Sequence, residues 1–189
     1  MVDPDAVTVL VDKQRRLPPG YEPTDLVPPD VAFTFAGPSP KRLLRAEAAT
    51  ALEELFAAAA ADGLPLAAVS GFRSEATQAQ LFEAYAARDG EVEASRYSAH
   101  PGHSEHQTGL AMDVTGSDGA CPAEPCFAGT PEARWLADHA ADHGFVIRYP
   151  EGAEAITGYR YEPWHLRYVG VDVARDVVRL GVTLDEYLA

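Results

Sequence analysis

Lysine is scarce in this chain of 189 residues, because only Lys13 and Lys41 are lysines among its fifteen basic residues. The formal net charge is −14, and the acidic residues are spread along the sequence without a long run of one sign. Such a surface repels nucleic-acid phosphates and offers no polybasic patch to an anionic membrane. The composition therefore excludes nucleic acid as a partner and predicts an ordinary globular protein with a solvated surface.

Long hydrophobic runs are also absent, and no stretch approaches the roughly 20 apolar residues of a membrane span. The longest candidate, LEELFAAAAADGL (52–64), carries charges, so it predicts a helix with one buried face. The first residues, MVDPDAV, lack both the basic and the apolar segment of a signal peptide. The length favours one domain with a hydrophobic core, and we expect a monomer without a membrane span.

Cysteine occurs twice, at Cys121 and Cys126, within a turn-rich loop. Cysteine-based zinc sites need further thiolates or a nearby Cys–His pair, and neither is evident. The favoured interpretation is a disulfide across this small loop, with two free thiols as the alternative. A disulfide indicates an extracytoplasmic location, in the cell envelope or outside the cell.

Proline is concentrated in residues 1–40, where it favours extended and irregular backbone. We expect these residues to form an arm packed on a catalytic domain that spans 41–189. The apolar run VTVLV (7–11) predicts an edge strand within the arm.

Apolar spacing and capping residues predict the elements of the rest of the chain. The expected helices cover 41–63, 74–88, 130–144 and 171–180, and the expected strands cover 64–72, 110–114, 145–149 and 160–169. Pro163 must then lie at an edge or a bulge of its strand. Because helices and strands do not alternate regularly, the predicted fold class is α+β: a single domain with a small, mainly antiparallel sheet flanked by helices.

Ionisable residues interrupt three segments in which the pattern favours apolar ones. Arg73 ends a buried strand in SGFRSEATQ, Asp113 lies inside the strand of SAHPGHSEHQTGLAMD, and YEPWHLRY places Glu162 and His165 among aromatic residues. Buried carboxylates and histidines are costly unless they are paired or bind a metal. Each interruption alone fits a structural role, but their combination indicates a metal site.

Two histidines and one carboxylate form a three-ligand site that leaves a zinc position open for water. The residues alone leave the first histidine open among His100, His103 and His106. Glu162 is the candidate base, although positions three apart on an ideal strand face opposite sides, so the chain must bend at Pro163. An arginine such as Arg73 can stabilise the oxyanion of an attacked carbonyl.

The same segments, with FVIRYPEGAEAITGYRYEPWHLRYVG and the closing GVTLDEYL, resemble the VanY-type D-alanyl-D-alanine carboxypeptidases. That family comprises zinc peptidases with the hedgehog/DD-peptidase fold, and the resemblance runs from LPPGYEPTDLV (17–27) to the C-terminus. The site residues that it implies are the zinc ligands His106, Asp113 and His165, the base Glu162, Arg73 on the attacked carbonyl, and Gln78, Ser98 and Ser104 on the peptide. By the same resemblance, His100 and His103 are not ligands.

The implied function is removal of the C-terminal D-alanine from a peptidoglycan stem peptide, or from its precursor, by zinc-activated water. Two alternatives lie within the family: an L,D-carboxypeptidase that trims the tetrapeptide, and a D-Ala-D-Ala dipeptidase. A non-heme iron oxygenase also uses two histidines and a carboxylate, but it leaves Glu162 without a role. An inert cell-wall-binding module is a further alternative, although such modules usually lose a ligand or the base.

Overall fold

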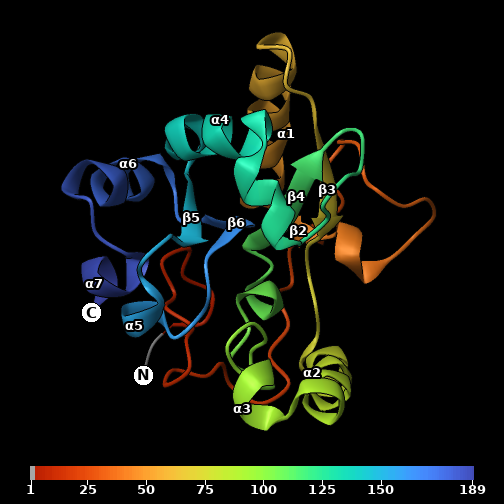
Figure 1. Ribbon diagram of the computed structural model, residues 1–189, viewed down its shortest axis with the longest axis vertical. Coiled ribbons are helices and arrows are strands. Elements are labelled where there is room, and N and C mark those ends of the chain that lie inside the picture. Colours follow the sequence, from red (N-terminus) through yellow and green to blue (C-terminus); the bar gives the residue numbers. More distant parts are fainter. Residues whose placement is uncertain (1–2) are drawn as a thin grey trace.

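A four-stranded antiparallel sheet forms the centre of the fold in the computed structural model, which describes residues 3–189 (Figure 1). Its strands, in the order β3-β4-β6-β5, are β3 (Leu66–Ser70), β4 (Ala111–Gly116), β6 (Glu162–Tyr168) and β5 (Phe145–Tyr149). A second antiparallel pair joins β1 (Leu26–Val27) to β2 (Leu44–Arg45). This architecture confirms the predicted α+β class, a single domain with small antiparallel sheets and helices.

The helices occupy the stretches that the apolar spacing indicates, with three short additions, α3 (Glu91–Ala94), α5 (Glu154–Thr157) and α7 (Leu184–Leu188). The longer helices are α1 (Ala46–Ala61), α2 (Glu75–Asp89), α4 (Pro131–His139) and α6 (Val171–Leu180). Ser74 and Thr130 cap α2 and α4 by accepting from backbone N–H groups in the first turn. The first long helix starts later than expected, because residues 40–42 form a 3₁₀ turn and β2 pairs with β1. No helix within residues 3–189 is long and apolar enough to cross a membrane.

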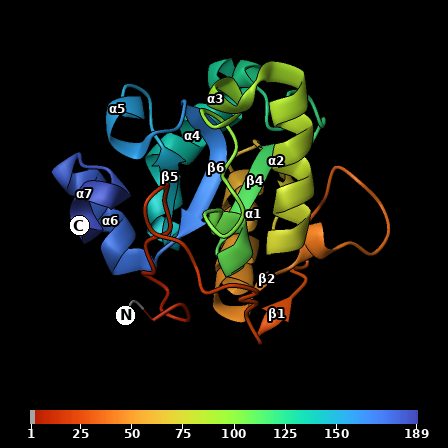
Figure 2. The same ribbon diagram turned by 90° about the horizontal axis from the view of Figure 1, so that it is seen from below.

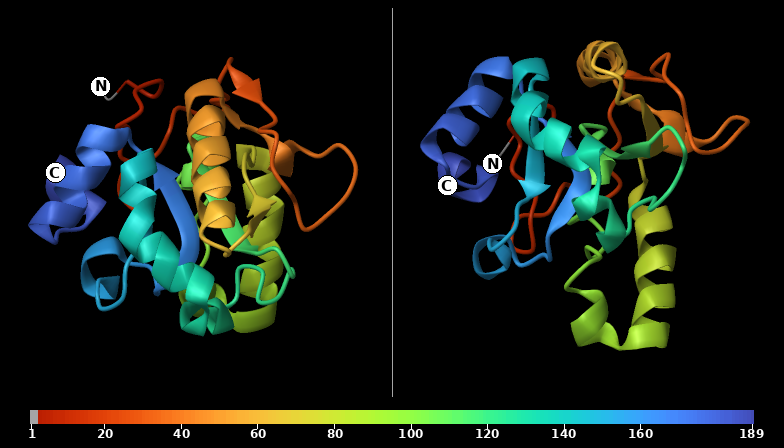
Figure 3. Two further views of the ribbon diagram at one scale, coloured as in Figure 1. Left: turned by 90° about the horizontal axis from the view of Figure 1, so that it is seen from above. Right: turned by 45° about the horizontal axis from the view of Figure 1, so that its top comes forward.

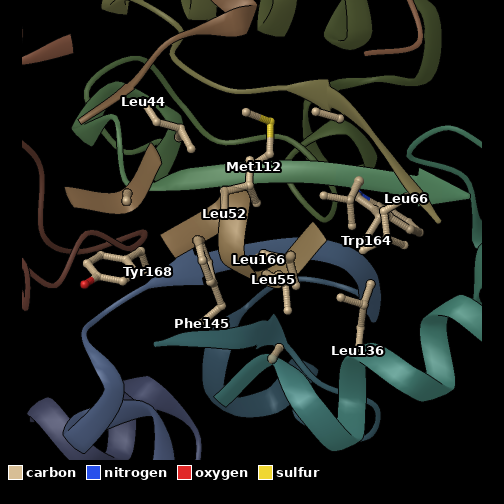
Figure 4. Close-up of a cluster of buried hydrophobic side chains, with 14 of the residues drawn as sticks. Leu44, Leu52, Leu55, Leu66, Met112, Leu136, Phe145, Trp164, Leu166 and Tyr168 are labelled. Carbon is tan, nitrogen blue, oxygen red and sulfur yellow. The ribbon is translucent and has the colours of Figure 1, made fainter. Parts of the chain in front are cut away.

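The two faces of the central sheet differ in chemistry. Helices α1 and α4 cover one face, as the left view of Figure 3 shows, and the apolar core lies between them and the strands (Figures 3 and 4). Met112 and Val114 of β4 and Leu166 of β6 belong to this core. Because neighbouring residues of a strand point to opposite faces, Asp113 and His165 point the other way. Polar residues that alternate with core residues along β4 and β6 thus form the second, polar face of the sheet.

The N-terminal segment crosses the polar face of the sheet (Figure 2). Val9, Val11 and Leu17 are buried in the main core cluster, although residues 7–11 form no strand, so that prediction was wrong. The backbone carbonyls of Val7 and Val9 instead accept hydrogen bonds from the guanidinium of Arg167, at 2.9 and 2.7 Å. A buried side chain therefore takes the acceptors that a neighbouring strand would have used.

Pro163 lies in β6, which is an inner strand between β4 and β5 rather than an edge. The pairing of β5 with β6 shifts register between Ile147 opposite Leu166 and Tyr149 opposite Glu162. Two steps along β5 thus match four steps along β6, which places an irregularity in β6 around Pro163. The proline needs no ladder partner there, and the alternation of side chains changes at that point.

A disulfide joins Cys121 and Cys126, with their Cα atoms 5.7 Å apart. This is the pairing that the sequence favours. The enclosed turn contains Ala123 in the left-handed region, at φ 55°.

Candidate active site

Three buried side chains converge on the polar face of the sheet: His106, Asp113 and His165. Asp113 of β4 is paired directly with His165 of β6, and His106 lies in the 3₁₀ turn Glu105–Thr108 just before β4. Nε2 of His106 is 3.4 Å from Oδ2 of Asp113, and Nδ1 of His165 is 3.1 Å from Oδ1. One ligand atom from each residue lies within 4.8 Å of the others, as a metal centre requires.

This donor set fits zinc. Two imidazole nitrogens and one carboxylate oxygen leave a fourth position open, as in catalytic zinc sites. Oδ1 of Asp113 is buried and has no hydrogen-bond partner among residues 3–189. An unpaired carboxylate oxygen is costly in the protein interior, and a cation between the three side chains would satisfy it.

Each histidine is oriented through its other ring nitrogen. Nδ1 of His106 is 2.8 Å from the carbonyl oxygen of Gly71, and Nε2 of His165 is 3.4 Å from a carboxylate oxygen of Glu105. Because a carbonyl or carboxylate oxygen accepts hydrogen bonds, the neutral form of each ring would carry its hydrogen on this nitrogen. The lone pairs of His106 Nε2 and His165 Nδ1 then face Asp113, in the arrangement typical of metal-binding histidines.

Glu162 lies beside this cluster, with Oε2 3.8 Å from Nδ1 of His165. The two residues are three apart in sequence and share one face because the register shifts around Pro163. Burial, reinforced by the nearby carboxylate of Asp113, raises the pKa of Glu162 to about 8. A cation at the cluster would favour the ionised form of this side chain.

Three of the remaining predicted residues, Arg73, Gln78 and Ser98, form a hydrogen-bonded chain next to the cluster. Nη1 of Arg73 donates to the side-chain oxygen of Gln78 at 2.9 Å, and Nη2 donates to Ser70 Oγ at 3.2 Å. Nε2 of Gln78 donates in turn to Ser98 Oγ at 3.2 Å. Arg73, Ser98 and Ser104 line the cavity, whereas Gln78 is buried behind them. In this structure Gln78 therefore orients Arg73 rather than facing the cavity.

His100 and His103 lie apart from the cluster. The His100 ring packs against Phe82, with centroids 4.1 Å apart, and Nδ1 of His103 is 2.7 Å from the carbonyl oxygen of Asp12. The structure thus brings together His106 with Asp113 and His165, whereas His100 packs against an aromatic ring and His103 hydrogen-bonds to the N-terminal segment.

The cluster opens into a cavity of about 750 Å³, within the range of ligand sites. Tyr85 of α2 and Tyr97 lie along one wall, and Ala123 and Glu124 of the disulfide loop contribute to another. Tyr159, Tyr161 and Trp164 also line it. The cavity therefore extends well beyond the space around His106, Asp113 and His165.

Three buried charged residues next to the cluster were not predicted from the sequence: Glu105, Arg148 and Arg167. The arginines interrupt the apolar strands FVIRY and HLRY, which is the signal that marked Asp113. On strands with one solvent-facing side, that signal indicates exposure. Here both faces of the sheet are covered, so the arginines are buried.

A protein-family model described as VanY, D-alanyl-D-alanine carboxypeptidase, matches residues 41–171, which is more than half of the chain. The chain belongs to the VanY family. The YodJ protein of Bacillus subtilis strain 168 is 46% identical over 185 residues, which cover 98% of this chain and 68% of YodJ. Membership confirms the resemblance that the motifs indicated and supports carboxypeptidase activity.

Solved structures of two family members have the same fold. The LdcB LD-carboxypeptidase superposes with a TM-score of 0.93 at 47% identity, covering 97% of this chain and 86% of that one. The D,D-pentapeptidase VanY, solved as a variant in complex with Zn(II), superposes with a TM-score of 0.77 at 29% identity, covering 97% and 99%. The VanY fold thus accompanies both L,D- and D,D-carboxypeptidases.

Proposed function

We propose that this protein is a zinc-dependent carboxypeptidase that releases the C-terminal D-alanine of peptidoglycan stem peptides. The observation that carries the proposal is the convergence of His106, Asp113, His165 and Glu162 in the lining of one cavity. The Zn(II) complex of the related VanY supports zinc as the metal. The unpaired Oδ1 of Asp113 supports a cation at this position independently.

The roles of the side chains follow from their chemistry. A zinc ion held by the three ligands would act as a Lewis acid and lower the pKa of a bound water. Glu162 would take one proton from the attacking water as its oxygen bonds to the peptide carbonyl carbon. Arg73 would stabilise the negative charge that develops on the carbonyl oxygen. The C–N bond then breaks as Glu162 returns the proton to the nitrogen of the departing D-alanine.

Cleavage of an L,D bond, as in a tetrapeptide stem, is the more specific form of this proposal. The supporting observation is that LdcB, an LD-carboxypeptidase, is 47% identical to this chain, whereas the D,D-pentapeptidase VanY is 29% identical. A dipeptidase is less well supported, because the cavity extends to Tyr85 and Tyr97, beyond the needs of a dipeptide. An inert binding module has no use for a buried base beside the three ligands.

The setting of the enzyme is part of the proposal. Peptidoglycan stem peptides are processed outside the cytoplasm, and the disulfide between Cys121 and Cys126 fits that environment. We also propose that residues 1–40 serve as an arm that supports the catalytic domain 41–189. The monomeric state stays a prediction that light scattering would check.

The decisive experiment measures product masses after incubation with zinc and with tetrapeptide or pentapeptide stems. We expect loss of one D-alanine, with the tetrapeptide as the preferred substrate. Glu162→Gln should abolish release while zinc stays bound, and Glu151→Gln, on the exposed surface, is the matched control. If the wild-type protein released alanine from neither stem, or if Glu162→Gln were fully active, the proposal would be wrong.

A further inference from the structure

Two arginine side chains without exposed surface lie next to the metal-ligand residues: Arg148 of β5 and Arg167 of β6. Nε of Arg148 and Nη1 of Arg167 each donate to Oε1 of Glu105, and both distances are 2.7 Å. The Glu105 side chain is also fully buried. A buried ionic cluster stabilises a fold little more than apolar side chains of the same volume would. Its role must therefore lie in what it orients.

The second carboxylate oxygen of Glu105 faces a metal ligand. Oε2 lies 3.4 Å from Nε2 of His165, whose other nitrogen, Nδ1, faces Asp113. With both guanidinium groups donating to Oε1, Oε2 remains as the acceptor that faces Nε2 of His165, and this arrangement favours the tautomer of His165 that keeps Nδ1 free.

We propose that Glu105, held between Arg148 and Arg167, is a positioning residue that fixes His165 as an Nδ1 ligand of the metal. This inference rests on the zinc site of the proposed function. Glu105 directly precedes His106, so one short 3₁₀ turn supplies a ligand and orients the ligand opposite it. Displacement of that turn would disturb both histidines together.

The two arginines also connect Glu105 to segments near both ends of the chain. Arg148 forms a two-point ion pair with Asp185 of α7, in which Nη2 and Oδ1 are 3.1 Å apart. Arg167 donates to the carbonyl oxygens of Val7 and Val9. Asp185 thus holds the guanidinium group that donates to Glu105. Asp185 should therefore influence zinc affinity without touching the metal position.

The test compares Glu105→Gln and Asp185→Asn with Asp142→Asn, a matched control in an exposed ion pair with Arg175. The readouts are the zinc dissociation constant, from competition with a chromophoric chelator, and the visible spectrum of the Co²⁺-substituted protein. Long-range ¹H–¹⁵N correlation spectra would report the tautomer of His165 in the metal-free protein. Folding of each variant is checked by circular dichroism.

We expect Glu105→Gln to weaken zinc binding by about 10- to 100-fold and to alter the Co²⁺ spectrum, because an amide cannot accept from all three donors. Asp185→Asn should weaken binding by about tenfold, and the control should match the wild type. Wild-type zinc affinity and Co²⁺ spectrum in a folded Glu105→Gln would overturn the inference. If Glu105→Gln does not fold, wild-type affinity in Asp185→Asn would overturn it.

The wild-type measurement separates this inference from the proposed function. Tight zinc binding and alanine release by the wild type, with unchanged affinity in both variants, would remove only the positioning role of Glu105. A wild-type protein that binds no zinc would overturn the metal site and this inference with it.

Discussion

Replacing Arg73 by alanine should slow the reaction while leaving the metal in place. No carboxylate within residues 3–189 forms an ion pair with Arg73, whose side-chain partners are the neutral groups of Gln78 and Ser70. Its charge is therefore free to act on a substrate, and its direction is fixed by two hydrogen bonds. Removing one donor to a developing oxyanion typically costs about 10²- to 10³-fold in kcat, or about 2.7–4 kcal/mol.

The structure distinguishes a specific loss from a general loss of positive charge. Arg88 lines the same cavity, and its side chain is 64% exposed, so Arg88→Ala is the matched control and should change kcat little. Arg73→Lys keeps the charge but loses the planar guanidinium group that contacts both Gln78 and Ser70. Its kcat should therefore lie between those of the wild type and Arg73→Ala.

The assay is D-alanine release from tetrapeptide and pentapeptide stems, with kcat and KM determined at equal zinc content. A fall in kcat with little change in KM would place Arg73 at the atom under attack. A rise in KM alone would instead indicate that Arg73 binds the C-terminal carboxylate of the peptide substrate. Unchanged kcat and KM in Arg73→Ala would refute the reasoning altogether.

Three further predictions concern stability and the rim of the cavity. Zinc at about 1,000 times its Kd should stabilise the folded protein by about 4 kcal/mol and raise Tm by about 8–16 °C, and an unchanged Tm after chelation would contradict the metal site. Replacing Cys121 and Cys126 by serine should cost about 2 kcal/mol or less in denaturant unfolding and raise KM without weakening zinc binding. Gly71→Ala should destabilise the fold by about 1–3 kcal/mol, because its Cβ would lie 2.5 Å from the carbonyl oxygen of Leu43. It should also weaken zinc binding, because the carbonyl oxygen of Gly71 is the partner of His106 Nδ1. A wild-type melting temperature would refute this prediction.

Local signals in the sequence predicted the elements that depend on local physics. Strand β5 and helix α6 have the predicted bounds, because glycines in the left-handed conformation, Gly144 and Gly181, mark the start of one and the end of the other. The error at residues 7–11 has a non-local cause. Arg167 binds the carbonyl of Val9 across 158 positions of sequence, and no local pattern reveals that contact.

The residues of the candidate site differ in how far the sequence alone could identify them. Asp113, Glu162 and His165 interrupt apolar segments, so physical chemistry alone marked them, whereas only the family resemblance selected His106 among three histidines. Arg148 and Arg167 carried the same kind of signal, but alternation along a strand does not tell whether its second face is covered. The cluster around Glu105 depends on that covering, which the N-terminal segment supplies.

The division of the site between rigid and variable parts explains how one fold accommodates several peptidases. The proposed ligands His106, Asp113 and His165 and the proposed base Glu162 lie on β4, β6 and the turn before β4, where the sheet fixes their geometry. The distal cavity walls come instead from α2, from the segment around Tyr97 and from the disulfide loop. Changes in those walls can alter which peptide binds while the hydrolytic chemistry stays the same. LdcB and VanY can therefore share this fold and still cleave different bonds, and we expect those walls to determine the peptide specificity of this protein.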